Sequence, residues 1–170
     1  MTDEKHPEVE FEHDDFDFAT IEEEIRVDER CQALLQRFYQ HLQASGLTPQ
    51  QASDLAYSAD YYLRDYLLDF ARQNVVRPEP GVVRRFAANW FIVSTLDPEM
   101  ATLERHLAAI GELYRFLRVS HLISESELTF IEDEVAQVEY YRQRIERFIS
   151  ISGDGYQEWE AECPLKGLSN

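Results

Sequence analysis

The chain has 170 residues, carries a formal net charge of −17 at pH 7 and is 44% hydrophobic. That length fits one domain with its own core, and the two cysteines, Cys31 and Cys163, are too few for a disulfide framework. The first ten residues lack the basic and apolar regions of a signal peptide, and no apolar stretch reaches the roughly 18 residues of a membrane span. We therefore exclude exported disulfide scaffolds and membrane proteins, and expect a cytoplasmic protein.

The negative charge is concentrated at the N-terminus. Residues 1–30 hold thirteen Asp or Glu against three Lys or Arg, whereas the other 140 residues carry a net charge of only −7. We interpret residues 1–19 as an acidic arm that is disordered or loosely docked. It is either a solvated tail or a docking segment that lays aromatic rings in a groove and carboxylates on a basic surface. The candidate docking residues are Phe11, Asp14, Asp15, Phe16, Asp17 and Phe18.

Helix start and stop signals follow the arm. Thr20 precedes Glu23 in the form of a capping box, so a first helix begins there or at Asp28 and ends at Gly46, which suits a left-handed C-cap. Thr48, followed by a proline, opens a second helix. Its apolar residues recur every three or four positions from Leu55 to Phe70, and it ends before Pro78.

Three further helices are expected in the second half. The segment 82–91 is short, rich in apolar residues and expected to be the most deeply buried element. Asp97 is the predicted N-cap of a long helix with a core face from Met100 to Leu117. Ser124 opens a last helix that reaches Phe148.

These signals predict an all-α protein, with five to six helices in a compact bundle or orthogonal array. The helical domain spans residues 20–151, and residues 152–170 form a C-terminal tail that packs on the domain through Tyr156, Trp159 and Leu165.

The sequence contains no recognisable active site. An EF-hand loop starting at Asp15 would lack its Gly and Glu, and the one Glu-x-x-His motif, at Glu10 and His13, has no second copy for a di-iron site. Cys31 reads as a small buried residue, and the histidines His41, His106 and His121 as solvated or capped. We predict no catalytic, cofactor or metal residue, and no enzyme.

Residues 34–70, 82–90 and 102–125 resemble, in order and spacing, the SAM-like core-binding domain of tyrosine recombinases, the phage-integrase family. The first segment joins two helices through a Gly-Leu-Thr turn, and the last ends a long helix with a Phe-Leu pair and a Leu-Ile turn. The stretch that contains these segments, residues 34–125, covers a little over half of the chain.

The resemblance implies an array of helices that clamps DNA with basic residues. The family's catalytic domain is missing, since no histidine is followed by Arg three residues later, so we expect no recombinase activity. The candidate DNA face consists of Arg64, Arg84, Arg85, Arg115 and Arg118. A contiguous face would favour DNA, whereas scattered arginines paired with carboxylates would not.

Two functions follow as expectations. The first is a non-catalytic helical protein that acts through protein contacts, its acidic arm engaging a basic partner or a neighbouring copy. The alternative is a DNA-binding or recombination accessory module derived from the integrase domain, with the arm lying over the arginine face.

Overall fold

The computed structural model of the protein describes residues 11–151 and 155–162, and this part of the chain is helical, without strands. Within it the helices join into seven continuous rods. The rods are α1 (Ile21–Ala44); α2 (Pro49–Asp60) continued by a π-helical segment (Tyr61–Ala71); α3 (Val82–Arg85), a second π-helical segment (Phe86–Trp90) and α4 (Phe91–Ser94); α5 (Met100–Val119); α6 (Glu125–Val135); α7 (Val138–Ile149); and α8 (Gly155–Ala161). The all-α prediction is confirmed, and the expected number of helices is slightly too low.

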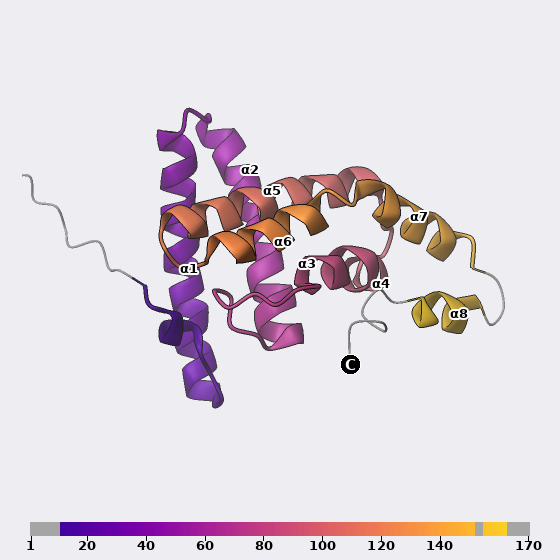
Figure 1. Ribbon diagram of the computed structural model, residues 1–170, viewed down its shortest axis with the longest axis horizontal. Helices are drawn as coiled ribbons and strands as arrows, with labels where there is room; N and C mark the ends of the chain where they lie inside the picture. The colour runs from indigo at the N-terminus through magenta and orange to yellow at the C-terminus, as the bar shows by residue number, and fades with distance from the viewer. Residues whose placement is uncertain (1–10, 152–154, 163–170) are drawn as a thin grey trace, which may run out of the picture.

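The rods form a compact array in which α1 and α2 make a hairpin and α5 crosses it (Figure 1). The chain then returns along α5 as α6 and continues into α7. α8 packs against α7, and the rod from α3 to α4 contacts both α6 and α7. The described end of the arm lies beside the lower half of α1 and contains a short 3-10 turn (His13–Phe16).

Three of the predicted N-caps are confirmed. The hydroxyls of Thr20, Thr48 and Ser124 each accept a hydrogen bond from the backbone N–H three residues later, so α1 begins at the earlier of its two predicted starts. The prediction for Asp97 is wrong, because α5 begins only after Glu99, which supplies no side-chain cap.

The π-helical continuation of α2 changes which residues reach the core. A π-helix has i to i+5 hydrogen bonds and advances by a smaller angle per residue than an α-helix, so the apolar stripe drifts around the rod. Tyr62 and Tyr66 remain buried, but Phe70, predicted to be a core residue, is 52% exposed. The hydroxyls of Tyr62 and Tyr114 meet at 2.7 Å inside the core.

The predicted last helix is interrupted between α6 and α7, at Ala136 and Gln137. The carbonyl oxygen of Glu134, on the last turn of α6, accepts a hydrogen bond from the Tyr141 hydroxyl at 2.5 Å, which compensates for the broken helical ladder. The buried Glu134 carboxylate accepts from the backbone N–H groups of Gly81 and Arg84, at 2.9 and 2.8 Å. It therefore caps the start of α3 from another helix.

Part of the C-terminal segment packs on the domain through Arg144 and Trp159. Arg144 is 2% exposed and donates to the carbonyl oxygens of Ala88 and Trp159, at 3.0 and 2.8 Å. Its guanidinium lies 3.9 Å from the centre of the Trp159 ring, whose N–H donates back to the Arg144 carbonyl. These contacts fix α8 on α7; Leu165 lies outside the described residues.

Candidate functional site

The second half of the acidic arm, residues 11–18, is docked on the body of the protein. Phe16 has no exposed surface and belongs to the hydrophobic core, and its ring lies 5.5 Å from that of Phe11. The expectation of a disordered or loosely docked arm is corrected for these residues, because a fully buried phenylalanine holds the segment down. Residues 1–10 lie outside the described residues.

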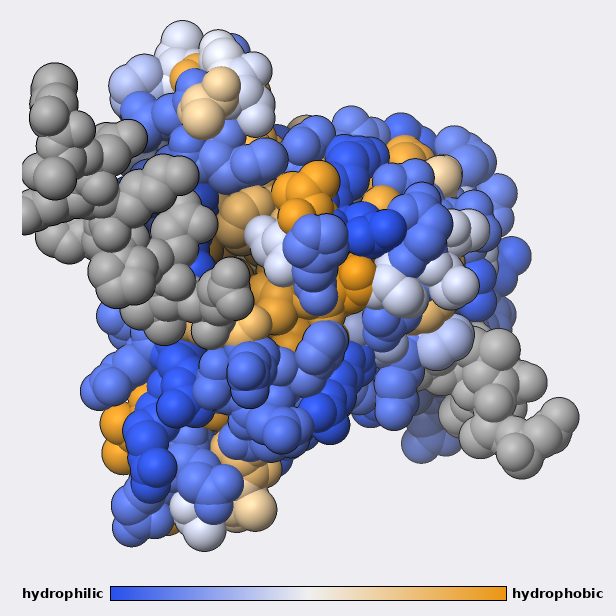
Figure 2. Space-filling model, turned by 60° about the vertical axis from the view of Figure 1, so that its left-hand side comes forward, coloured by the Kyte–Doolittle hydropathy of each residue, from blue (hydrophilic) through white to orange (hydrophobic). Residues whose placement is uncertain are grey.

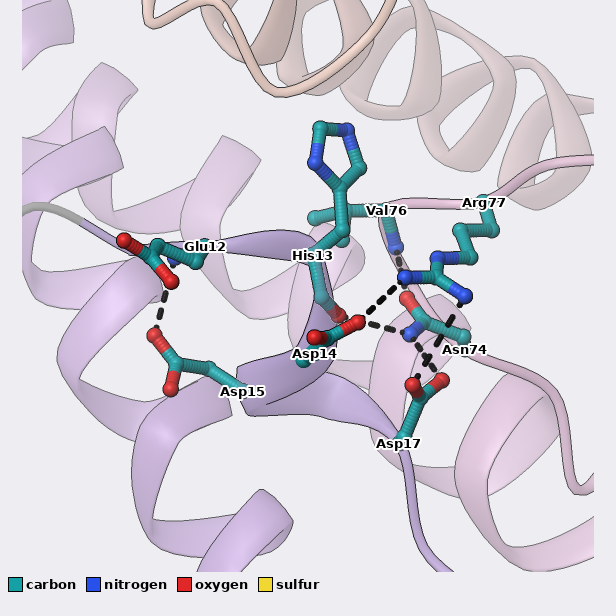
Figure 3. Close-up of polar contacts among 8 residues, drawn as sticks. All are labelled: Glu12, His13, Asp14, Asp15, Asp17, Asn74, Val76 and Arg77. Carbon is teal, nitrogen blue, oxygen red and sulfur yellow. Dashed lines mark hydrogen bonds and ion pairs between the residues drawn. The ribbon is translucent and has the colours of Figure 1, made fainter.

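Carboxylates of the arm meet basic and amide side chains of the loop after the first π-helical segment (Figure 3). Arg77 forms ion pairs with Asp14 at 2.6 Å and with Asp17 at 3.6 Å. The amide nitrogen of Asn74 donates to the Asp17 carboxylate at 2.7 Å and to the His13 carbonyl oxygen at 2.9 Å. The basic surface predicted for the arm is thus part of the same chain.

The remaining arm residues contact α1 and Arg72. Arg30 donates to the Asp15 carbonyl oxygen at 2.6 Å, and its guanidinium lies 4.0 Å from the Asp15 carboxylate. Guanidinium groups also cover both outer rings, Arg37 over Phe11 at 4.8 Å and Arg72 over Phe18 at 5.1 Å. A partner that took up this segment would have to displace these contacts.

Phe11 forms one end of a groove between α1 and the C-terminal end of α5, which we call the α1–α5 groove. Its volume is about 700 Å³. Its buried lining residues are apolar: Leu34, Phe116 and Leu122. Figure 2 shows apolar side chains gathered in a hollow in the middle of this face, with hydrophilic residues around it.

The polar lining of the α1–α5 groove is cationic or neutral. It includes Arg37 and His41, one turn apart on α1, and His121 from the end of α5, but no Asp or Glu. Neither Arg37 nor the two histidines form an ion pair with a carboxylate in the part of the chain that the structure describes. In a chain with 33 acids and 16 Lys or Arg, a depression without carboxylates stands out.

His121 is held at the groove in an unusual backbone conformation. The end of α5 closes with hydrogen bonds from Leu122 N to Leu117 O at 2.9 Å and from His121 N to Arg118 O at 3.1 Å. In this pattern of hydrogen bonds the first residue after the helix end adopts the left-handed backbone conformation. His121 is that residue, and its φ is 62°. Glycine is usual at this position, and a side chain here costs roughly 1 kcal/mol. His121 therefore places its imidazole at the rim of the groove in spite of this backbone strain.

The arginines of the DNA hypothesis come from three rods. Three of them form ion pairs: Arg64 with Asp60 and Asp28, Arg115 with Glu112 and Glu132, and Arg118 with Glu125. Arg84 donates to the side chain of Gln137, and Arg85 lies over the ring of Phe70. Ion pairing neutralises much of the charge that a phosphate backbone needs, so this geometry does not favour DNA.

The described residues provide little for nucleophilic or metal chemistry. Burial, followed by the charge of Asp28, raises the pKa of the Cys31 thiol to about 12, so the reactive thiolate is not formed near neutral pH. Cys163 lies outside the described residues. Across residues 11–151 and 155–162, no three His, Cys, Asp or Glu come together as metal ligands, and no helix has the length and apolar character needed to cross a membrane.

His106 is a residue that the sequence interpretation misplaced. It was expected to be solvated or capped, but it is 9% exposed, stacks on Tyr61 at 5.0 Å, and its buried Nδ1 has no hydrogen-bond partner. Burial, and secondly the charge of Arg105, lowers the His106 pKa from 6.5 to about 4. The burial of His106 could have been predicted from the sequence, because His106 falls on the same helical face as Leu103 and Ile110.

We expect His106 to make the protein less stable in mild acid. Below pH 6.5 the unfolded chain binds a proton that the folded chain does not take up until about pH 4, so the free energy of unfolding falls over that range. The loss attributable to His106 is about 2 kcal/mol between pH 7.5 and pH 5. Urea denaturation of the wild type and of His106→Phe at both values measures it. Equal losses in the two proteins would contradict the prediction.

Comparison of the chain with protein-family models, with curated proteins and with solved structures finds no match. The resemblance to the integrase core-binding domain therefore stays a prediction from the sequence.

Proposed function

We propose that this chain is a cytoplasmic, non-catalytic helical protein that acts through contacts with another protein, and that the α1–α5 groove is the contact surface. The observation that carries the proposal is the groove itself, an open depression with an apolar lining and a rim that holds one arginine, two histidines and no carboxylate. Apolar hollows bordered by polar residues are typical of surfaces that receive a side chain or a helix of a partner.

The acidic arm has a different part in this proposal from the one first expected. Phe16 is in the core, and Asp14, Asp15 and Asp17 already contact arginines of the same chain. The described arm therefore builds the groove, through Phe11, rather than reaching out to a basic partner.

A photo-crosslinking amino acid in place of Val119 tests the proposal. Val119 lines the groove and is 62% exposed, so a bound protein lies within reach of this position. We expect irradiation in an extract of the cells that make the protein to give a discrete crosslinked product, and light scattering of the pure protein to show whether a second copy is that partner.

The matched control places the same amino acid at Leu96, which is fully exposed and is not part of the groove. Equal products at both positions, or none at position 119, would contradict the proposal, because exposure alone would then explain the crosslinks.

A further inference from the structure

Resting on the proposed function, we propose that the α1–α5 groove binds an acidic segment of a partner protein that carries a large apolar anchor residue. The anchor occupies the lining formed by Leu34, Phe116 and Leu122, and the carboxylates lie against Arg37, His41 and His121.

Charge is the first argument for an acidic ligand. An arginine and two histidines border the groove, and no lining residue is acidic. Arg37 donates no hydrogen bond to a carboxylate of the described chain, and its guanidinium instead covers the ring of Phe11 at 4.8 Å. A carboxylate of a partner could pair with Arg37 and accept hydrogen bonds from the two imidazoles without breaking an existing ion pair, whereas a basic segment would be repelled by the Arg37 guanidinium.

The second argument is that this surface already holds a segment of the same chemistry. In the docked arm, Phe16 is fully buried while the flanking Asp15 and Asp17 contact Arg30 and Arg77. The aromatic ring supplies the buried area and the carboxylates fix the orientation, a division of roles common at protein interfaces. The groove continues this surface beyond Phe11 with an apolar lining and with Arg37, His41 and His121 at its rim.

The shape also suits a peptide segment rather than a small molecule. A groove of about 700 Å³ that runs between two helices takes several residues of an extended or helical segment. The rim residue Val119 is 62% exposed and would be covered by such a segment.

Fluorescence anisotropy with three labelled peptides tests the inference on the full chain. The first is a dodecapeptide in which Glu alternates with Leu and Phe, the second has Gln in place of Glu, and the third has Lys. We expect the Glu peptide to bind most tightly and to weaken as salt rises from 50 to 300 mM. Arg37→Gln and His121→Asn should each weaken binding about threefold, and the Asn variant keeps a residue that tolerates the left-handed backbone.

Arg105→Gln is the matched control, because it removes an arginine from the other end of α5, outside the groove. The inference is overturned if this control weakens binding as much as Arg37→Gln, or if the Gln peptide binds as tightly as the Glu peptide. Tight binding of the Gln peptide that Val119→Ser abolishes would leave the groove as a contact surface for a ligand that is not acidic. No binding of any peptide also overturns the inference, and the crosslink at position 119 then decides separately on the proposed function.

The chain's own N-terminal sequence is the competing occupant, because Asp3, Glu4, Glu8 and Glu10 precede Phe11. A full-length variant with these four residues changed to Asn or Gln distinguishes a partner segment from the chain's own N-terminus as the occupant of the groove. If the variant binds the Glu peptide as tightly as the wild type does, the result supports a partner protein as the occupant. If the variant binds the peptide more than tenfold more tightly, residues 1–10 are the occupant and the inference of a partner segment is overturned.

Discussion

Phe16→Ala is expected to lower the free energy of unfolding by about 3 kcal/mol, a large effect for a residue in an N-terminal segment. Phe16 has no exposed surface and packs in the core, with Phe11 beside it. Truncating a buried phenylalanine removes its transfer free energy and leaves a cavity that the helices only partly fill. Equilibrium unfolding in urea, followed by circular dichroism, measures the change through the transition midpoint.

Phe18→Ala is the matched control, since Phe18 is only partly buried and lies under Arg72. We expect it to cost about 1 kcal/mol. If the arm opened locally before the domain unfolds, both substitutions would cost the same small amount, because each could lose no more than the docking free energy of the segment. That outcome would restore the loosely docked arm.

The sequence was a good guide where local chemistry determines structure. The capping residues Thr20, Thr48 and Ser124 and the left-handed Gly46 mark helix ends through contacts within a few residues, and the structure confirms them. The helical face of each rod followed from its apolar period until the π-helical segment changed that period and turned Phe70 outward.

The sequence was a poor guide where a residue acts across the fold. Phe16 lies among acidic residues, so the local composition indicates a solvated arm, and only its packing in the hydrophobic core explains its burial. The α1–α5 groove brings the arm and α1 together with the end of α5, which lies about 75 residues or more further along the chain. Arg37, His41 and His121 could not be grouped from spacing alone.

Glu134 illustrates the same limit and carries the second large effect. In the sequence it belongs to a run of acids near the start of a long helix, where a solvated carboxylate is expected. In the structure Glu134 is 4% exposed, and its carboxylate takes the role of an N-cap side chain for α3. The N-cap position of α3 itself holds Gly81, which has no side chain and has a φ of 95°. Position 81 needs glycine for that backbone, so the cap has to come from elsewhere.

Glu134→Ala should therefore cost about 3 kcal/mol in unfolding free energy, because it leaves the buried N–H of Gly81 and the partly buried N–H of Arg84 without an acceptor and removes a negative charge from a helix N-terminus. Glu134→Gln keeps one acceptor but turns an amide N–H₂ towards the other donor. Its unfolding free energy should therefore lie between those of the wild type and Glu134→Ala. Glu132→Ala is the control two residues away: it removes an exposed partner of Arg115 and should cost less than about 1 kcal/mol. Urea denaturation of the three variants decides, and equal costs for Glu132→Ala and Glu134→Ala would mean that the carboxylate does not hold α6 to α3.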